Sequence, residues 1–400
     1  MYLFVADVHY FCYIHYVVKE AIVVNDERQL IRDAEDAVRR IFEELCFKTI
    51  QIQRKTLIGG RKLDAIIRGT SGETQFEIVI EVRKRITPQT AMSVCEQMRK
   101  IPDDIIPVVF SPVISPRVAE ILEQNEVGYV DQAGNCRLRS TRHRLLIDRH
   151  GYKSPARPPK GIADLFSPKS SRIVRTMLAQ PGKGWQVREL ATHPDIEVSV
   201  GLAAKVKQTL IEESYAIEHK RQLYLRDSVG LLENWAKYCS EKFIGPADQV
   251  TMFFRGNTEE AEQAVAQWCQ DNSIRFALAG FSAAWQLAPA VRYSVAAVYV
   301  DGNGFEREML GKLDSFRGGK PVETGANLLL WRPYDSSVFV DSRKDSKTNL
   351  PVTSAIQTYL DLRRLGGRGE EAAMAVYEKL LAIPMKEAAQ QIEEMCHAKL

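Results

Sequence analysis

The sequence predicts a multidomain protein of mixed α/β and α+β class: an N-terminal α/β domain, a central winged helix-turn-helix and a C-terminal α/β domain. Helical segments alternate with apolar strands in the first part of the chain. Lys153–Pro159 (KSPARPP) has the composition of a linker. A chain of 400 residues is long enough for two or three domains. We therefore place the domains at residues 1–155, 161–232 and 245–400, with 1–24 as an extra strand or a poorly ordered extension.

The first domain begins with a predicted helix from about Asp26 to Leu45. Apolar strands are predicted near residues 63–67, 76–82 and 105–110. Between the last two strands, Thr87-Pro88 supplies an N-cap and first-turn pair for a helix that reaches Arg99. This alternation predicts an α/β domain.

The central domain begins at Ser167-Pro168, an N-cap and first-turn pair, and its first helix stops at Pro181-Gly182. A short strand over Gly184–Val187 and a helix over Arg188–Ala191 follow. After a break, a third helix opens at Ser199.

Behind the third helix, two alternating strands surround the polar tip Glu218–Gln222, which forms the wing. Small, polar and basic residues on the third helix and at the tip suit a helix that lies in a major groove. We therefore predict DNA binding; a protein-interaction module is the alternative. The predicted DNA-binding residues are Lys169, Arg172, Arg188, Ser199, Gly201, Ala204, Lys205, Gln208, His219, Lys220 and Arg221.

A constellation in the first domain resembles the PD-(D/E)xK nuclease fold, whose paired acids hold a divalent metal and whose lysine supports the chemistry. Asp64 and Glu81 lie on consecutive predicted strands joined by the polar turn Gly69–Thr74. Their midpoint, (64 + 81)/2 = 72.5, falls in that turn, so they are expected to face each other across a hairpin. Arg83 shares the face of Glu81 and occupies the position of the lysine.

Arginine keeps its proton at working pH, so we expect an inactive nuclease-like domain used for binding or dimerisation. The alternative function is a metal-dependent DNA nuclease targeted by the winged helix. In that case Asp64 and Glu81 hold a divalent metal such as Mg²⁺, with Arg83 and Gln97 as further catalytic candidates and Glu35 as a weaker one. No cofactor is expected otherwise. An unrelated α/β domain with an ordinary Glu81–Arg83 ion pair is a third interpretation.

Composition sets few limits. The net charge of +3 is too small to identify a partner, but Arg137–Lys160 is a strongly basic run that either contacts phosphates or is a solvated linker. Seven scattered cysteines without CxxC spacing indicate reduced thiols in a cytoplasm rather than a structural zinc site. Charged residues interrupt the apolar first 24 residues, so neither a signal peptide nor a membrane span is expected.

The C-terminal domain offers little chemistry of its own. A nucleotidyltransferase needs paired carboxylates for two-metal phosphoryl transfer, and the strand after Gly280–Ser282 offers only Asp301. Near the end of the chain, Gly366 and Gly367 are predicted to end a helix. The neighbouring arginines, Arg363, Arg364 and Arg368, are expected to turn outward, either as a solvated helix end or as a site for an anion or partner.

Three further stretches carry a family resemblance: Gly128–Asn135, Ala279–Ala284 and Pro351–Leu362, the last followed by Gly366–Ala372. Together with the winged helix they resemble the AbiEi-type antitoxins and transcriptional regulators of type IV toxin-antitoxin systems, in the long form with an N-terminal nuclease-like domain. In the short members the winged helix stands at the N-terminus, whereas here it is central.

The resemblance implies a DNA-binding autorepressor of a toxin-antitoxin or defence operon. In that family the winged helix binds operator repeats, and the C-terminal domain carries antitoxin activity against a nucleotidyltransferase-type toxin encoded beside it. We therefore expect a transcriptional regulator of antitoxin type whose partners are double-stranded DNA and such a toxin. A homodimer is expected, because operators are usually read as two half-sites.

Overall fold

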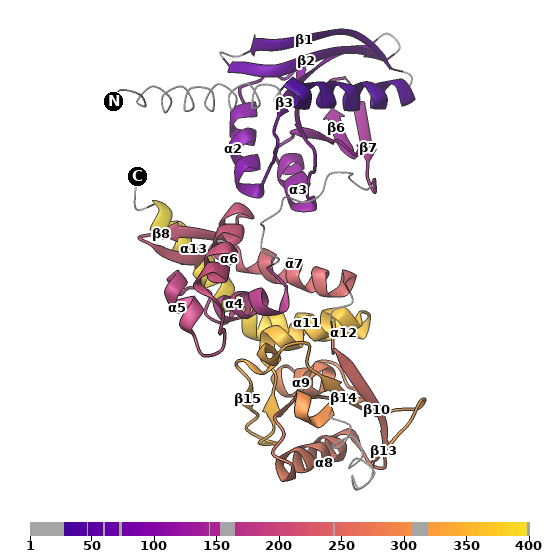
Figure 1. Ribbon diagram of the computed structural model, residues 1–400. Helices are drawn as coiled ribbons and strands as arrows, with labels where there is room; N and C mark the ends of the chain where they lie inside the picture. Colours follow the sequence, from indigo (N-terminus) through magenta and orange to yellow (C-terminus); the bar gives the residue numbers. More distant parts are fainter. Residues whose placement is uncertain are drawn as a thin grey trace, which may run out of the picture. The chain divides into compact units, whose positions relative to one another are not determined.

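The computed structural model describes residues 28–45, 47–58, 61–71, 74–143, 145–152, 165–242, 245–305 and 319–397. It divides into two compact units, Met1–Lys160 and Gly161–Leu400 (Figure 1). The predicted extension 1–24 and the predicted linker 153–159 lie outside the described residues.

The first unit is built on a seven-stranded sheet whose strands follow chain order from β1 to β7. The pairs β3·β4 and β4·β5 are parallel, and the other pairs are antiparallel. The strands are β1 Lys48–Ile58, β2 Arg61–Ser71, β3 Thr74–Val82, β4 Ile105–Ser111, β5 Gly128–Asp131, β6 Cys136–Ser140 and β7 Leu145–Arg149.

Helices cover both faces of this sheet because the central strands are apolar on both sides. The helix over residues 28–44 packs with Ile80 and Val108 on one face. On the other face, α2 (Pro88–Met98) and α3 (Pro116–Gln124) pack with Val109 and Tyr129. The α/β prediction for the first domain is thus confirmed at the level of its elements.

The β2–β3 hairpin has the predicted register, with Ala65 opposite Ile80 and Ser71 opposite Thr74. The predicted turn over 69–74 was too long, because Gly69 pairs with Phe76 inside the ladder. A Cβ at Gly69 would lie 2.8 Å from Cζ of Phe76, so the glycine makes room for that ring rather than for a turn.

In the second unit, helices α4 (Pro168–Ala179), α5 (Val187–Thr192) and α6 (Val200–Glu212) precede the hairpin of β8 (Ala216–His219) and β9 (Gln222–Leu225). The strand predicted over 184–187 reduces to a bridge in which Trp185 and Leu223 exchange two backbone hydrogen bonds of 3.0 and 2.8 Å. After β9 the chain continues into α7 (Ser228–Glu241).

The rest of the unit forms a second seven-stranded sheet of order β13-β10-β14-β12-β11-β16-β15. Helix α8 (Thr258–Asp271) covers the face that carries Leu278 and Val298, and Tyr299 and Trp331 lie on the other face. The strands are β10 Asp248–Phe254, β11 Phe276–Leu278, β12 Ala296–Val300, β13 Gly319–Pro321, β14 Leu328–Arg332, β15 Arg343–Lys344 and β16 Pro351–Val352. The further helical segments are α9 Gly280–Leu287, η1 Gly302–Phe305, η3 Ser336–Phe339, α11 Ala355–Leu365, α12 Arg368–Val376, the π-helical turn Tyr377–Leu381 and α13 Ala382–His397.

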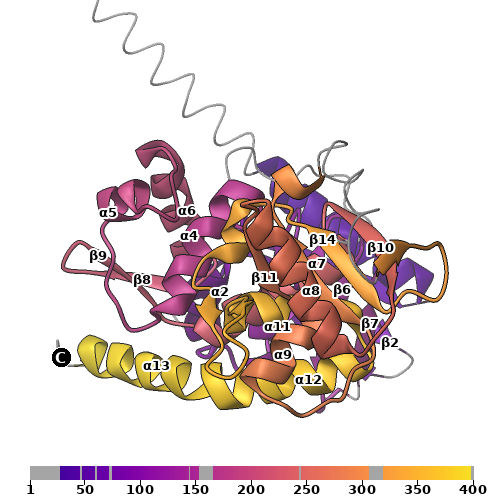
Figure 2. The same cartoon turned by 90° about the horizontal axis from the view of Figure 1, so that it is seen from below.

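A single core joins α4–α7 to the C-terminal helices. It includes Leu178 and Leu210 together with Trp235 of α7, Tyr359 of α11 and Met385 of α13. Helix α13 runs beside the β8–β9 hairpin (Figures 1 and 2). The segments 161–232 and 245–400 therefore pack as one unit.

Two arginines of α4 reach across this junction. Arg172 binds the carboxylate of Asp335 through Nε at 3.0 Å and through Nη2 at 2.8 Å. Arg175 is 1% exposed, stacks over Trp235 at 4.9 Å and donates a 3.0 Å hydrogen bond to the Tyr334 hydroxyl. These contacts fix α4 against the segment that follows β14.

The end of α11 differs in part from the prediction. Gly366 and Gly367 end the helix as expected, with φ of 64° and 52°. Arg363 and Arg364 do not turn outward, however. Arg363 donates to the Tyr359 hydroxyl at 2.9 Å, and Arg364 stacks over Trp331 at 5.4 Å. Arg368 donates at 2.6 Å to the carbonyl of Arg292. Aromatic rings thus hold the guanidinium groups of Arg363 and Arg364 in the fold, whereas Arg368 is exposed, as expected.

The contact between Arg172 and Asp335 is expected to stabilise the second unit. Asp335→Asn keeps an oxygen that accepts from the Ser337 N–H but removes the charge, so the free energy of unfolding should fall by about 1 to 3 kcal/mol. All five tryptophans lie after residue 184, so tryptophan fluorescence during urea unfolding reports this unit alone.

The control is Glu241→Gln, which removes the exposed pair with Lys237 and should change the free energy of unfolding by less than about 0.5 kcal/mol. If the two substitutions lower the free energy of unfolding equally, the Arg172–Asp335 contact stabilises the unit no more than an exposed ion pair does.

Asp361 of α11 makes the stability of the same unit depend on pH. Burial raises the pKa of its carboxyl to about 6, although Arg364 and the hydrogen bonds from Tyr299 and Gln357 favour the ionised form. An unfolded aspartate titrates near 3.9. The folded chain therefore binds this proton more tightly, and the associated stability, complete below about pH 4, is lost as the pH rises through about 6.

Asp361→Asn carries no charge and should flatten the pH dependence of the free energy of unfolding between about pH 4 and 6, the interval between the unfolded and folded pKa values. Urea titrations at several pH values, followed by tryptophan fluorescence, measure this. Asp271→Asn, at an exposed carboxylate of α8, is the control and should leave the slope unchanged. An unchanged slope in Asp361→Asn would contradict the assignment.

Candidate nucleic-acid interface

Helix α6 presents one face to solvent and the opposite face to the core. Ser199 caps it by accepting a 3.2 Å hydrogen bond from the backbone N–H of Leu202. Ala203, Val206 and Leu210 are fully buried. The predicted contact residues of this helix all lie exposed on the outer face: Ser199, Gly201, Ala204, Lys205 and Gln208.

The second lysine of the helix does not belong to this face. Lys207 is half-buried and forms a 2.6 Å ion pair with Glu218 of β8. Lys205 is therefore the exposed lysine of α6, and Lys207 connects the helix to β8.

Lys220 and Arg221 form the two-residue tip of the β8–β9 hairpin. His219 pairs with Gln222 in the ladder directly below them, and both basic side chains are exposed. Their φ angles are 48° and 65°, so both have left-handed backbones. Such a tip matches the twist of a hairpin but favours Asn or Gly. Two basic residues thus occupy positions where L side chains are strained.

The remaining predicted residues differ in availability. Lys169, in the first turn of α4, and Arg188, on α5, are exposed, and His219 is half-buried. Arg172 is not available for a phosphate, because it binds Asp335 and also donates to the carbonyl of Ile196 at 3.3 Å. We therefore remove Arg172 from the interface.

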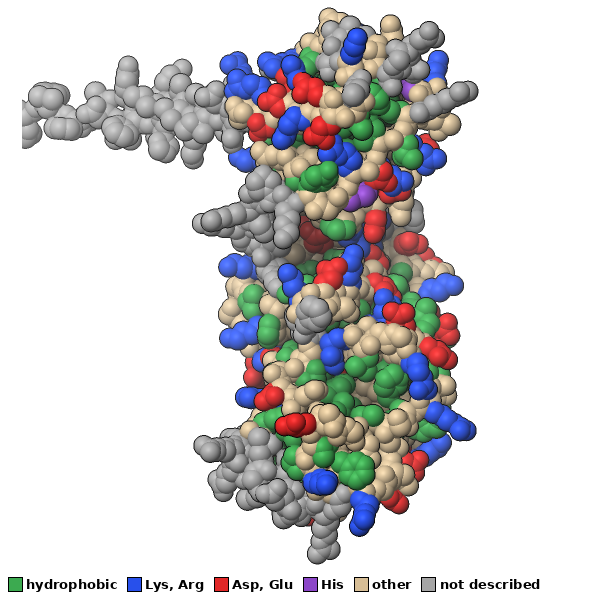
Figure 3. Space-filling view, turned by 90° about the vertical axis from the view of Figure 1, so that its right-hand side faces the viewer, with side chains coloured by type: hydrophobic (Ala, Val, Ile, Leu, Met, Phe, Trp, Pro, Cys, Tyr) green, Lys and Arg blue, Asp and Glu red, His purple; other side chains and the backbone are tan. Residues whose placement is uncertain are grey.

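Over the face of Gly161–Leu400 drawn in Figure 3, Lys and Arg side chains are interspersed with acidic ones. The candidate interface itself is described by the individual exposed residues of α6 and of the hairpin tip.

The nuclease-like residues of the first unit are close together but engaged. Glu81 is 5% exposed and forms a 2.5 Å ion pair with Arg83. One carboxylate oxygen of Asp64 accepts a 2.8 Å hydrogen bond from the backbone N–H of Val82. An arginine that neutralises the buried glutamate at this distance competes directly with a cation for the same oxygen.

The accessory candidates lie elsewhere. Glu35 holds Arg54 through two hydrogen bonds of 2.7 and 2.6 Å, and Gln97 is exposed on α2. In the part of the chain that the structure describes, no group of three or more His, Cys, Asp or Glu side chains is arranged to hold a metal ion.

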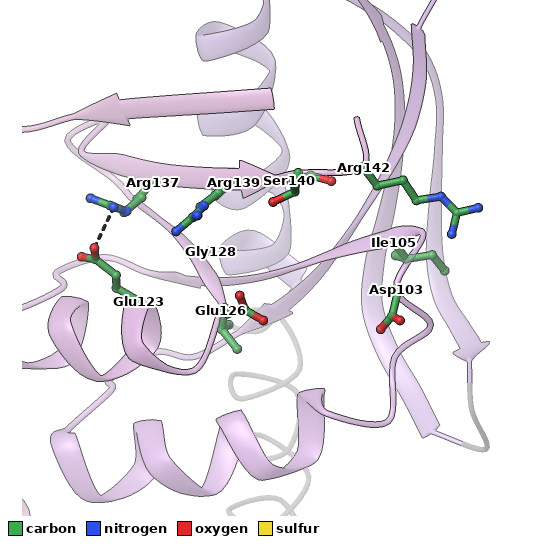
Figure 4. A pocket seen from close by; sticks show the side chains of 11 residues that line it. Asp103, Ile105, Glu123, Glu126, Gly128, Arg137, Arg139, Ser140 and Arg142 are labelled. Carbon is green, nitrogen blue, oxygen red and sulfur yellow. Dashed lines mark ion pairs between the residues drawn. The ribbon is translucent and has the colours of Figure 1, made fainter. Parts of the chain in front are cut away.

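A polar cavity of about 320 Å³ opens at the N-terminal ends of β4 and β5, where Ile105 and Gly128 line it (Figure 4). Glu123 and Arg137 form a 2.7 Å ion pair across it, and Arg139 and Glu126 lie on opposite walls. The mixture of acidic and basic groups balances the charge of the cavity. Ile105, which lines it, pairs with Glu77 rather than with Glu81, so the cavity is separate from the nuclease-like residues.

The basic run after Arg137 is partly neutralised within the first unit. Arg137 also pairs with Asp148 at 2.8 Å, and Arg149 pairs with Glu44 at 2.7 Å. Arg139 and Arg142 are exposed, and the run beyond Tyr152 lies outside the described residues.

Sequence reasoning missed one residue of the α6 face. Val200, at the first helical position, is 49% exposed. The available signal was the spacing: three and four residues beyond Val200 stand only Ala203 and Ala204, so no large apolar neighbour covers it.

Comparison with protein families finds a match for part of the second unit. Residues 224–382 match the family described as "Transcriptional regulator, AbiEi antitoxin, Type IV TA system". The resemblance found in the sequence is thereby confirmed from β9 to the start of α13. The match does not include α4–α6 or the first unit. No curated protein and no solved structure matches the chain.

The described helices include none with the length and apolar character needed to cross a membrane. The matched family is one of transcriptional regulators with an antitoxin role.

The Glu81–Arg83 pair predicts that the first unit does not cleave DNA. Incubation of the purified protein with single- and double-stranded DNA and Mg²⁺ or Mn²⁺ should leave the substrate intact, because Arg83 cannot give up its proton and neutralises the buried acid. Glu81→Ala, tested in parallel, identifies contaminating activity. Cleavage by the wild type that disappears in Glu81→Ala would establish the metal-dependent nuclease instead.

Proposed function

We propose that the protein is a sequence-specific, DNA-binding transcriptional regulator of antitoxin type that represses its own operon. The observation that carries this proposal is the pairing of an exposed, polar α6 face with a basic hairpin tip. A winged helix-turn-helix uses these two elements, placing the helix in the major groove and the wing on the backbone or the minor groove. The family match to residues 224–382 supports the regulatory and antitoxin role.

Within this interface the residues have different roles. We propose that Lys205 and Gln208 contact base edges, with Ser199 at the start of the helix. Gln208 Nε2 donates at 3.0 Å to the exposed Glu212 and would exchange this contact for a base. Lys220 and Arg221 are positioned to neutralise phosphates, with Lys169, Arg188 and His219 at the margins. We propose that this binding needs no metal cofactor, so DNA binding should persist in EDTA.

The partners follow from the same proposal. Operators are usually read as two half-sites, so we propose a homodimer. A nucleotidyltransferase-type toxin is the proposed protein partner of the C-terminal part. Co-purification with the product of an adjacent reading frame tests the toxin, and sedimentation of the protein with and without DNA tests the dimer. The nuclease-like first unit is proposed to serve binding or dimerisation.

The hairpin tip should contribute affinity without sequence preference. Lys220→Ala combined with Arg221→Ala should weaken binding to all duplexes alike and reduce the salt slope, log Kd against log [salt], by about two. Gel shifts across a salt series measure this. Lys205→Ala should instead cost about 1 to 3 kcal/mol only on the preferred sequence.

The matched control is Lys237→Ala, an exposed lysine of α7 that lies outside the proposed interface. It should change neither affinity nor the salt slope. If Lys205→Ala, Lys220→Ala and Arg221→Ala combined bind DNA as the wild type does, α6 and the hairpin have no part in DNA binding.

A further inference from the structure

The exposed face of α6 carries apolar residues, Val200 and Ala204, beside its basic residue Lys205. Val200 and Ala204 lie one helical turn apart, and Gln208 continues the same row. Gly201 and Lys205 form the neighbouring row. A single exposed valine is ordinary on a protein surface, so the inference depends on what stands beside it.

Gly201 is a glycine that the fold itself does not require. Its φ is not in the left-handed region, and a Cβ built on it would meet only Ser199 Oγ at 4.0 Å. Gly201 lies in the first turn of α6, and the surrounding chain would accept an alanine there. The missing Cβ leaves room on the exposed face for an approaching surface.

Gly230 of α7 makes the contrast clear, because it also lies in the first turn of a helix. A Cβ on Gly230 would come within 3 Å of the Asp227 carboxylate, which caps α7 by accepting from the Gly230 N–H at 2.8 Å. The fold requires glycine at position 230, whereas at position 201 it does not.

The charges around this face indicate what approaches it. Lys205 adjoins the apolar row, and the basic tip Lys220-Arg221 lies on the hairpin that follows. An approaching surface that is anionic overall but apolar at its point of contact fits duplex DNA, whose major groove carries the C5-methyl group of thymine between phosphate backbones. The amide of Gln208 matches the N6/N7 edge of adenine in the same kind of base pair.

We propose that Val200 and Ala204 read thymine methyl groups in the major groove, that Gly201 allows the close approach, and that the preferred site is therefore rich in A·T pairs beneath the first two turns of α6. The inference rests on the proposed DNA binding and adds the chemical identity of the bases that are read.

The experiment starts by selecting the preferred duplex from a randomised duplex library with the full chain. Each thymine of that duplex is then replaced by deoxyuridine, which removes only the methyl group. At one or two contacted positions the wild type should lose about four-fold in affinity per methyl, the equivalent of one buried methyl-sized group. Val200→Ala should lose this sensitivity at the position that Val200 contacts.

Val229→Ala is the matched control, since Val229 is 37% exposed in the first turn of α7. It should keep the full sensitivity to deoxyuridine. Gly201→Ala should show opposite signs in two measurements: an unchanged or higher melting temperature, and binding to the selected duplex weakened about ten-fold. A glycine with a purely structural role would give a lower melting temperature instead.

The outcomes are distinguishable. If the library yields no bound duplex, DNA binding fails and the inference falls with it. If a duplex is selected but no deoxyuridine lowers affinity, or Val200→Ala keeps the sensitivity, the thymine reading is wrong while DNA binding stands. If Val200→Ala alters the sedimentation of the free protein and not its deoxyuridine profile, the apolar row contacts another protein and the proposal is overturned.

Discussion

The second unit depends on two arginines of one helix, the buried Arg175 and the half-buried Arg172. A guanidinium group cannot be neutralised by losing its proton, so burying it requires fixed partners. Arg175 has an aromatic face and a hydroxyl, and Arg172 has the carboxylate of Asp335. Hydrogen bonds from Arg172 and from Ser337 outweigh burial and lower the pKa of Asp335, which keeps that pair ionised. Helix α4 therefore cannot leave the C-terminal sheet without exposing these partners.

This constraint links the candidate DNA-binding elements to the family-matched region. Helix α4 packs against α6 and also against α11, so its position is determined from both sides. Tyr334 and Asp335 lie within the matched residues 224–382. A partner that shifts the segment after β14 would therefore act on α4 first. The two segments that sequence reasoning separated at 232 and 245 are, in physical terms, one body.

The sequence predicted best where local rules decide the structure. The Ser199 cap, the glycines after α11 and the midpoint rule for β2–β3 each depend on neighbours in the chain, and the structure has all three. The predictions from sequence failed where a residue far along the chain determines the position of a side chain. Arg172 was expected to face DNA because a basic residue on a short helix has no local partner, whereas Asp335 is 163 residues away. Arg363 and Arg364 were expected outside because the apolar stripe ends before them, yet Tyr359 and Trp331 accept their guanidinium groups.

The hairpin tip makes the strongest physical case for an external partner. An Asn-Gly tip would satisfy the same two left-handed positions with far less strain, and the ladder below, closed by His219 and Gln222, would be unchanged. Folding alone therefore gives no reason for Lys220 and Arg221. Gly201 presents the opposite case, a residue with too little side chain for its own helix. One element carries unnecessary charge at a cost in backbone strain, and the other omits a side chain at a cost in helix stability. The proposed DNA surface, contacted closely by α6 and flanked by phosphates at the tip, would account for both departures.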